Sequence, residues 1–190
     1  VALHALLTDD EAFIARWTEP VLKACAFLKE ARAQTDHDGV KGVLPPAVAM
    51  VTGIPAQAVW NIAWNYKGLE TAVRFLRRIG HPAADEYAHE AAEAKEAFLR
   101  AFREAAAKSA TWTDAAGRSR GVVPSTVSGT DLRTHPFFLD TGPLVLTYAG
   151  LVEADDPLMQ DALAFFREGP YVKLYDPRGD MHQRPVLTRE

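Results

Sequence analysis

The sequence has few of the features that mark disulfide-bonded, membrane-spanning or nucleic-acid-binding proteins. Cys25 is its only cysteine, which excludes an intrachain disulfide and weakly favours a reducing compartment. No apolar run reaches the roughly 18 residues that cross a bilayer. Acidic residues outnumber basic residues by 25 to 21, giving a net charge of −4, whereas nucleic acids and anionic membranes favour clustered positive charge. We therefore expect no nucleic-acid partner and no membrane partner.

Short catalytic and metal-binding signatures are also absent. The sequence contains no zinc-protease, paired-cysteine, serine-hydrolase, dinucleotide or P-loop pattern. Residues 36–39, Asp-His-Asp-Gly, resemble the start of a calcium loop, but the remaining ligands of an EF-hand do not follow. Cys25 lies on an apolar helical stripe, where a catalytic role is not expected. We therefore expect the chain to need no cofactor and no metal.

Helix-forming residues are plentiful. Alanine, the best helix former, accounts for 32 of the 190 residues. Apolar residues make up 48% and charged residues 24% of the chain, which indicates a folded globular protein. Residues 1–7 are predicted to end a helix, and Pro20 is predicted to kink or break the helix that follows. Helical spacing of apolar residues predicts five longer helices, over 9–34, 56–79, 83–108, 137–149 and 156–168.

These segments repeat one pattern, an apolar helix followed by an amphipathic one. The first half of 56–79 is apolar on nearly every side, which predicts burial on every side. The helix over 83–108 has one apolar stripe, and its charged remainder is predicted to face solvent. On that face Glu96 and Arg100 have the favourable i,i+4 order. Helices 137–149 and 156–168 repeat the order, so the chain is predicted to consist of helical hairpins.

The connections between these helices are of two lengths. Short turns join the two helices of each pair, whereas loops of about 20 to 28 residues join one pair to the next. The first loop covers 35–55, and the second, over 109–134, includes a possible short strand at Val122–Val123. An all-α toroid of antiparallel hairpins has this organisation. A compact bundle is an alternative, as is a solenoid, although its connections are usually short.

Three segments carry a resemblance to a known family. Asp38-Gly39 is followed at 42–46 by Gly-Val-Leu-Pro-Pro, and residues 60–72 read Trp-Asn-Ile-Ala-Trp-Asn-Tyr-Lys-Gly-Leu-Glu-Thr-Ala. Gly-Leu-Val and then Asp-Asp-Pro follow within 150–157. In this order the segments resemble the G-L-L-P loop, the W-x-N-A-W-x-x-x-G-L-x-x-A inner helix and the G-L-L-x-x-D-D-P turn of six-hairpin glycosidases, the (α/α)6-toroid glycoside hydrolases. The resemblance covers about residues 1–170.

This resemblance implies six helical hairpins, an oligosaccharide or polysaccharide substrate, and carboxylate chemistry. A complete toroid has twelve helices, whereas this chain holds about five and part of another. We therefore expect residues 1–190 to form one partial domain, about half of an (α/α)6 toroid, from a longer catalytic domain. The missing half, or a second chain in its place, is the expected protein partner, because an isolated half would expose apolar inner faces.

The candidate catalytic residues are carboxylates at the predicted mouth of the toroid, because glycoside hydrolysis usually needs two carboxyl groups. Asp38 precedes Gly39 in the first long loop, and Asp140 lies in the first turn of an inner helix. Glu190 stands where another inner helix is expected to begin. Simpler interpretations are an Asp-Gly turn for Asp38 and a favourable interaction with the helix dipole for Asp140.

The candidate substrate-binding residues are Trp60, Asn61, Trp64 and His135. The two tryptophans lie four residues apart on one helix face and could stack on the C–H face of a sugar ring, with Asn61 beside them. His135, in the second long loop, could bond a hydroxyl group. The alternatives are core packing for the tryptophans and a structural role for the histidine.

Two other functions stay open. A polysaccharide lyase on the same toroid would use a Tyr or His base and release unsaturated products that absorb ultraviolet light. A non-catalytic helical scaffold would instead present a concave protein-binding surface without clustered carboxylates.

Overall fold

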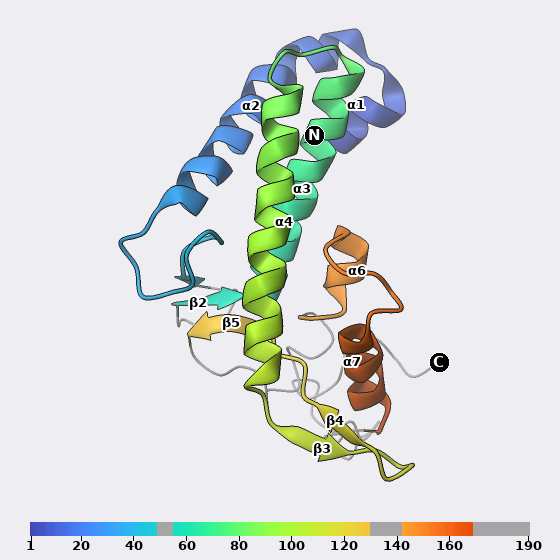
Figure 1. The fold of residues 1–190 in the computed structure, drawn as a ribbon. Coiled ribbons are helices and arrows are strands. Elements are labelled where there is room, and N and C mark those ends of the chain that lie inside the picture. The colour runs from blue at the N-terminus through green and yellow to red at the C-terminus, as the bar shows by residue number, and fades with distance from the viewer. Residues whose placement is uncertain (49–54, 130–141, 169–190) are drawn as a thin grey trace.

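The computed structural model describes residues 1–48, 55–129 and 142–168, and this part of the chain is mostly helical. The long helices α3 and α4 pack side by side as an antiparallel central pair (Figure 1). The described helices are α1 (Ala2–Thr8), α2 (Glu11–Ala33), α3 (Val59–Arg78), α4 (Ala84–Ala107), α6 (Val145–Ala149) and α7 (Pro157–Glu168).

Short turns join the two helices within each pair, as the sequence predicts. Asp9 adopts a left-handed conformation (φ 52°) between α1 and α2, and Asp10 caps α2 by accepting the Phe13 N–H at 2.9 Å. Gly80 (φ 64°) follows α3, and Gly150 (φ 82°) follows α6. Glycine adopts this left-handed conformation without the steric penalty of a side chain, which explains where both helices end. The predicted pairs α3–α4 and α6–α7 are therefore confirmed as consecutive helices.

The all-α prediction needs a correction, because the long connections contain strands. β1, β2 and β5 form a three-stranded antiparallel sheet, and β3 and β4 form a hairpin. The strand predicted at Val122–Val123 is wrong, since β4 ends at Gly121 and the next strand begins at Thr126. The strands are β1 (Ala47–Val48), β2 (Pro55–Ala58), β3 (Thr111–Thr113), β4 (Ser119–Gly121) and β5 (Thr126–Gly129).

The three-stranded sheet fixes the end of the molecule where α3 begins. β2 leads directly into α3 at Val59, whose N–H donates to the Ser125 carbonyl at 2.9 Å. Ala56 pairs with Gly129 of β5, where φ is 96° and a Cβ would lie 2.9 Å from the Ala56 Cα. Only glycine fits this close backbone approach. The first long loop and the second long connection therefore meet at the N-terminal end of α3.

Two clusters of buried apolar side chains lie along the central pair of α3 and α4. Around the first half of α3 and the second half of α4, the core includes Phe98 and Phe102, whose rings stack with centroids 5.3 Å apart. Around the second half of α3 and the first half of α4, it includes Leu76, Tyr87 and Cys25, from three different helices. Half-buried Tyr66 packs against both clusters. α3 and α4 therefore form a spine against which the other elements pack.

Several predicted element boundaries are wrong. α2 continues through Pro20, so the break predicted there as one of two alternatives is wrong, and the kink stays a prediction. α3 begins three residues later than predicted because 55–58 form a strand. The helix expected over 137–149 is helical at Val145–Ala149 and preceded by a turn at 142–144, while its predicted start lies outside the described residues. The prediction that the first half of α3 is buried on every side is also wrong, because Trp64 is 42% exposed.

Candidate functional site

The Asp38 loop is attached to the sheet by one buried amide. Gln57 in β2 is 1% exposed. Its Oε1 accepts the Val40 N–H at 2.7 Å and the Ser128 hydroxyl at 2.5 Å. Its Nε2 donates to the carbonyls of Val40 and Leu44, both at 2.8 Å. Because each of these groups would otherwise be a costly unpaired polar group, the Gln57 side chain holds the loop in place.

Gly39 is required where this loop meets Gln57. A Cβ at Gly39 would lie 2.6 Å from the Gln57 side chain, closer than carbon atoms can approach. The preceding residue, Asp38, is exposed. Gln57 lies only three residues before Trp60, so the loop brings Asp38 to the end of α3 that carries Trp60. The first long loop therefore meets the N-terminal end of α3.

A buried ion pair between α2 and α4 also holds this loop in place. Arg32 of α2 pairs with the carboxylate of Glu90 on α4, and their side chains are 12% and 8% exposed. The Arg32 Nε also donates to the Gly42 carbonyl at 3.0 Å. Glu90 belongs to the charged positions predicted to face solvent, and its burial corrects that prediction. The sequence did not reveal that α2 packs against this position of α4.

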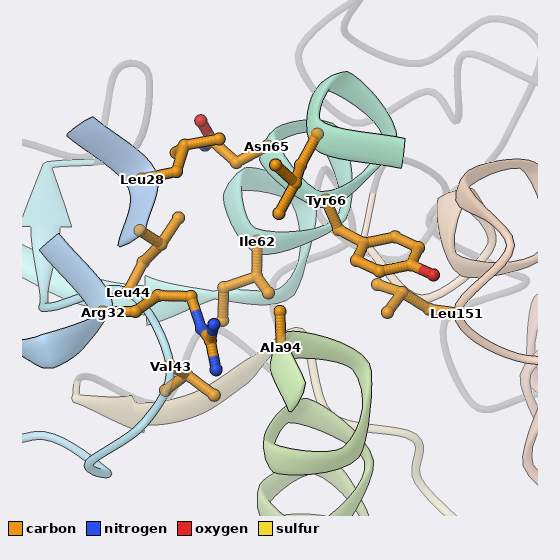
Figure 2. Close-up of a pocket in the computed structure, with 10 residues that line it drawn as sticks. Leu28, Arg32, Val43, Leu44, Ile62, Asn65, Tyr66, Ala94 and Leu151 are labelled. Atoms are coloured by element: carbon orange, nitrogen blue, oxygen red, sulfur yellow. The ribbon is translucent and has the colours of Figure 1, made fainter. Parts of the chain in front are cut away.

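The small cavity beside this ion pair is not a ligand site. Figure 2 shows side chains from α2, the loop after it, α3 and α4 surrounding a cavity of about 20 Å³. Leu28, Val43 and Ile62 supply much of its apolar lining. A cavity of this size holds roughly one water molecule.

Aromatic side chains of α3 and α6 form a second feature. The rings of Trp60 and Trp64 have centroids 6.1 Å apart and lie nearly edge to face. The Tyr148 ring of α6 lies 5.4 Å from that of Trp64. Trp64 is 42% and Tyr148 60% exposed. We call Trp60, Trp64 and Tyr148 the aromatic cluster, in which Trp64 and Tyr148 present ring surface to solvent and Trp60 is half-buried. Asn65, which follows Trp64, is also exposed.

The aromatic cluster lies at one end of a large groove. The groove has a volume of about 710 Å³ and is bounded by α1, α2, α3 and α6. Trp64 and Tyr148 line it together with exposed apolar residues of the first two helices, Leu3 and Phe27 among them. Its volume is within the 300–1,000 Å³ typical of ligand pockets. We name it the α2–α3 groove.

Basic residues accompany the apolar lining. Lys67 and Arg74 are the charged residues that line the α2–α3 groove among the described part of the chain. The Lys67 Nζ lies 5.6 Å from the centre of the Tyr148 ring, within the range of a cation–π interaction. The same nitrogen lies 3.4 Å from a carboxylate oxygen of Glu70. Buried Cys25 also lines the groove, and burial raises its pKa to about 11, which leaves a protonated, weakly nucleophilic thiol.

The structure brings together some of the predicted site residues and leaves others undescribed. Trp60 and Asn61 are half-buried in the first turn of α3, and exposed Trp64 lies one turn further. Asp140, Glu190 and His135 lie outside the described residues. The candidate carboxylate pairs of Asp38 with Asp140 or Glu190 therefore stay predictions. Glu168, another carboxylate at the predicted mouth, instead accepts the Ala115 N–H at 2.9 Å at the β3–β4 turn.

Sequence reasoning missed Tyr148 and Gln57. Tyr148 lies in a predicted apolar helix, but nothing in its spacing shows that it stacks beside a tryptophan 84 positions earlier. The helix predicted over 56–79 includes Gln57, so the sequence does not indicate that this residue lies in a strand. A signal was available in Gly39 and Gly42, because closely spaced glycines often indicate tight backbone packing.

A network of charges lies elsewhere, at the β3–β4 hairpin. The Asp114 side chain, 1% exposed, accepts the Arg118 N–H at 2.9 Å and the Arg120 Nε at 2.8 Å. The Arg118 backbone N–H, followed by the Arg120 side chain, holds the pKa of Asp114 well below its ordinary value near 3.8. Arg120 also contacts Asp161 of α7 at 2.6 Å. Every group is paired, so the network is structural rather than a site for chemistry.

The described residues reveal no metal site and no bilayer-spanning helix. Within 1–48, 55–129 and 142–168, no three His, Cys, Asp or Glu side chains gather as metal ligands would. In the same part of the chain, no helix is both long and apolar enough to cross a bilayer. Comparisons with protein-family models, curated proteins and solved structures give no match for this chain. A functional proposal therefore depends on the residues themselves.

Proposed function

We propose that this chain is part of a carbohydrate-active enzyme of the six-hairpin type, which hydrolyses glycosidic bonds. The observation that carries the proposal is the aromatic cluster of Trp60, Trp64 and Tyr148, in which Trp64 and Tyr148 are exposed and line the α2–α3 groove. The face of an aromatic ring is electron-rich, so it attracts the polarised C–H groups of a pyranose ring. The exposed amide of Asn65 offers a donor and an acceptor for sugar hydroxyls.

The position of the Asp38 loop supports the catalytic part of the proposal. Gln57 holds this loop at the N-terminal end of α3, where the aromatic cluster begins. In the proposed reaction, one carboxyl group protonates the departing glycosidic oxygen. A second acts as base for the attacking water or as nucleophile, and one water molecule is consumed. We assign these roles to Asp38, Asp140 and Glu190, of which two act in any one turnover.

Oligosaccharide binding by the 190-residue chain tests the aromatic cluster directly. Tryptophan fluorescence is followed during titration with a panel of plant and microbial oligosaccharides. We expect a saturable change for at least one sugar, weakened about fivefold in Trp64→Ala, since stacking on one aromatic ring contributes on the order of 1 kcal/mol. Trp17→Ala is the matched control, because Trp17 stacks with Phe13 and does not line the groove. No response to any sugar would contradict the proposal.

Activity assays separate the proposed hydrolase from the lyase alternative. A longer protein that contains this chain is assayed on aryl glycosides and on the oligosaccharides that bind. We expect hydrolysis without ultraviolet-absorbing products, and a loss of about a hundredfold or more in Asp38→Asn or Asp140→Asn, since general acid–base catalysis contributes 10²–10⁴-fold. If both variants keep the full rate, the assignment of catalytic residues is wrong. Unsaturated products would favour the lyase.

The exposed apolar lining of the α2–α3 groove favours a second candidate function, that of a helical interaction module. Leu3 and Phe27 are more than half exposed, although neither belongs to the aromatic cluster. An interaction module would bind a protein at this groove and would give no response to sugars. The titration described above therefore distinguishes the two functions.

A further inference from the structure

The α2–α3 groove has a shape that can accommodate an α-helix. Its floor contains small residues, with Ala24 on α2 and both Gly68 and Ala72 on α3. A Cβ at Gly68 would meet no atom within 4 Å, so the space above the floor is open on this side. Small residues at a contact allow two helix axes to approach to about 8 Å. Larger apolar side chains, including Leu3 and Phe27, form the walls.

The amount of exposed apolar side chain is unusual for a surface without a partner. Leu3 is 54%, Phe27 65% and Tyr148 60% exposed, and all three line this one groove. Scattered apolar residues are common on protein surfaces, whereas apolar residues gathered in one concave patch indicate an interface. Because four different helices contribute, the patch is a property of the fold rather than of one helix.

The charges of the groove restrict what can occupy it. Lys67 and Arg74 lie seven residues apart on α3, about 10 Å along the helix. Lys67 already pairs with Glu70 at 3.4 Å, whereas in the ranges 1–48, 55–129 and 142–168 no carboxylate forms an ion pair with Arg74. No acidic residue lines the groove within these ranges. An occupant that carries acidic residues two helical turns apart would therefore give Arg74 a partner and Lys67 a second one.

A second copy of the chain does not offer such an occupant in its described part. The amphipathic helices α4 and α7 already bury their apolar stripes, with Phe98 and Phe102 on α4 and Phe165 on α7. Two copies would have to place one cationic groove against another, which is electrostatically unfavourable.

We infer that the α2–α3 groove binds an amphipathic α-helix of a partner polypeptide, with an apolar stripe and acidic residues seven positions apart. The stripe packs over Gly68 and Ala72, and the two acids pair with Lys67 and Arg74. This inference does not depend on the sugar-binding role of the aromatic cluster, which lies at one end of the groove. It specifies where the expected protein partner binds and which residue types the partner presents there.

A synthetic peptide tests this inference with the 190-residue chain. The probe is a fluorescent helix of about 20 residues with a Leu/Ala stripe and two Glu residues seven apart. Its control has Lys in place of both Glu residues. Fluorescence anisotropy is expected to show saturable binding of the Glu peptide and binding weaker by about tenfold or more for the Lys peptide. Equal binding of both peptides, or of neither, would overturn the inference.

Two variants of the chain locate the binding. Gly68→Leu fills the open floor and should fold, because leucine is a better helix former than glycine and nothing lies in its way. It is expected to lose peptide binding, and Arg74→Glu is expected to weaken it about tenfold. Arg100→Glu on the exposed face of α4 is the matched control and should bind normally. Normal binding by both groove variants would overturn the inference.

Sedimentation and sugar titration complete the test. A dimer that Gly68→Leu dissociates would show that a second copy occupies the groove, which would overturn the choice of a partner helix. Gly68→Leu should keep any response to sugars, whereas Trp64→Ala should weaken it. Failure of peptide binding is therefore distinguishable from failure of the proposed function.

Discussion

Single residues decide how the loops of this protein are held. Gly39 and Gln57 fill one space together, since the missing Cβ of the glycine leaves room for the amide. Gln57 then satisfies polar groups of three other residues. The position of Asp38 therefore depends on a glycine and a glutamine that take no part in chemistry themselves.

Gly39→Ala should destabilise the protein by about 1–3 kcal/mol, because the added methyl group overlaps the Gln57 side chain. The matched control is Gly68→Ala, where the added methyl group meets nothing and helix propensity improves. That variant should gain about 0.5–1 kcal/mol. Urea unfolding followed by circular dichroism measures both changes. Equal stability of the two variants would contradict this account of Gly39.

Asp114 should make stability depend on pH. Its pKa is held below the ordinary value near 3.8, so its contribution is complete above about pH 5 and is lost as the pH falls through the folded pKa. Asp114→Asn should lower the Tm by a few degrees at pH 7, and the difference from the parent chain should shrink below about pH 4.

The control for Asp114 is Asp85→Asn, because the Asp85 side chain is 96% exposed. That variant should leave the Tm nearly unchanged at every pH. Thermal unfolding between pH 2 and pH 7 gives the comparison. A Tm difference for Asp114→Asn that does not change with pH would show that the carboxylate charge is not what stabilises the hairpin.

At the scale of elements, the order of helices could be predicted and the contacts between them could not. The periodicity of 83–108 predicts α4 to within a residue at each end, because its apolar stripe and charged face are unambiguous. The strand at 55–58 was missed because its short apolar sequence continues into α3 without a break in composition. Its identity as a strand comes from pairing with β5, more than 70 residues later.

The ion pair between α2 and α4 is a further contact that the sequence leaves hidden. Arg32→Met should destabilise the protein by about 3 kcal/mol, because the Glu90 carboxylate would be left buried without its partner. The double variant Arg32→Met/Glu90→Leu should recover most of this loss, since neither charge then remains buried. Chemical denaturation of the parent chain, the two single variants Arg32→Met and Glu90→Leu, and the double variant gives the coupling energy. An additive double variant would show that the two side chains do not act as a pair.

At the scale of the whole molecule, the described residues are mostly helical, with helical hairpins and small sheets at one end. The side of α3 that carries Trp64 was predicted to be buried but is exposed, because no described element packs over it. Trp64 and Tyr148 form an apolar surface that no described element covers. Sequence patterning shows that a surface is apolar, but whether a sugar, a helix or the chain itself covers it depends on the rest of the assembly. The toroid and its missing half are one proposal for that assembly.

The candidate site was partly predictable for the same reason. Trp60 and Trp64 share a helix face by spacing alone, and the structure places them in one cluster. The contribution of Tyr148 depends on the packing of α6 against α3, which sequence spacing does not contain. The candidate carboxylates are the least predictable part, because their separation depends on how the long connections fold.

The most direct test of the central claim, that the aromatic cluster binds sugar rings, is saturation-transfer NMR with the oligosaccharides that change the tryptophan fluorescence. Irradiation of aromatic protons should transfer saturation to ring C–H protons of the bound sugar. The transfer should be lost in Trp64→Ala and retained in Trp17→Ala, because only Trp64 lines the groove. Transfer that is undiminished in Trp64→Ala, or absent for every sugar, would contradict the account.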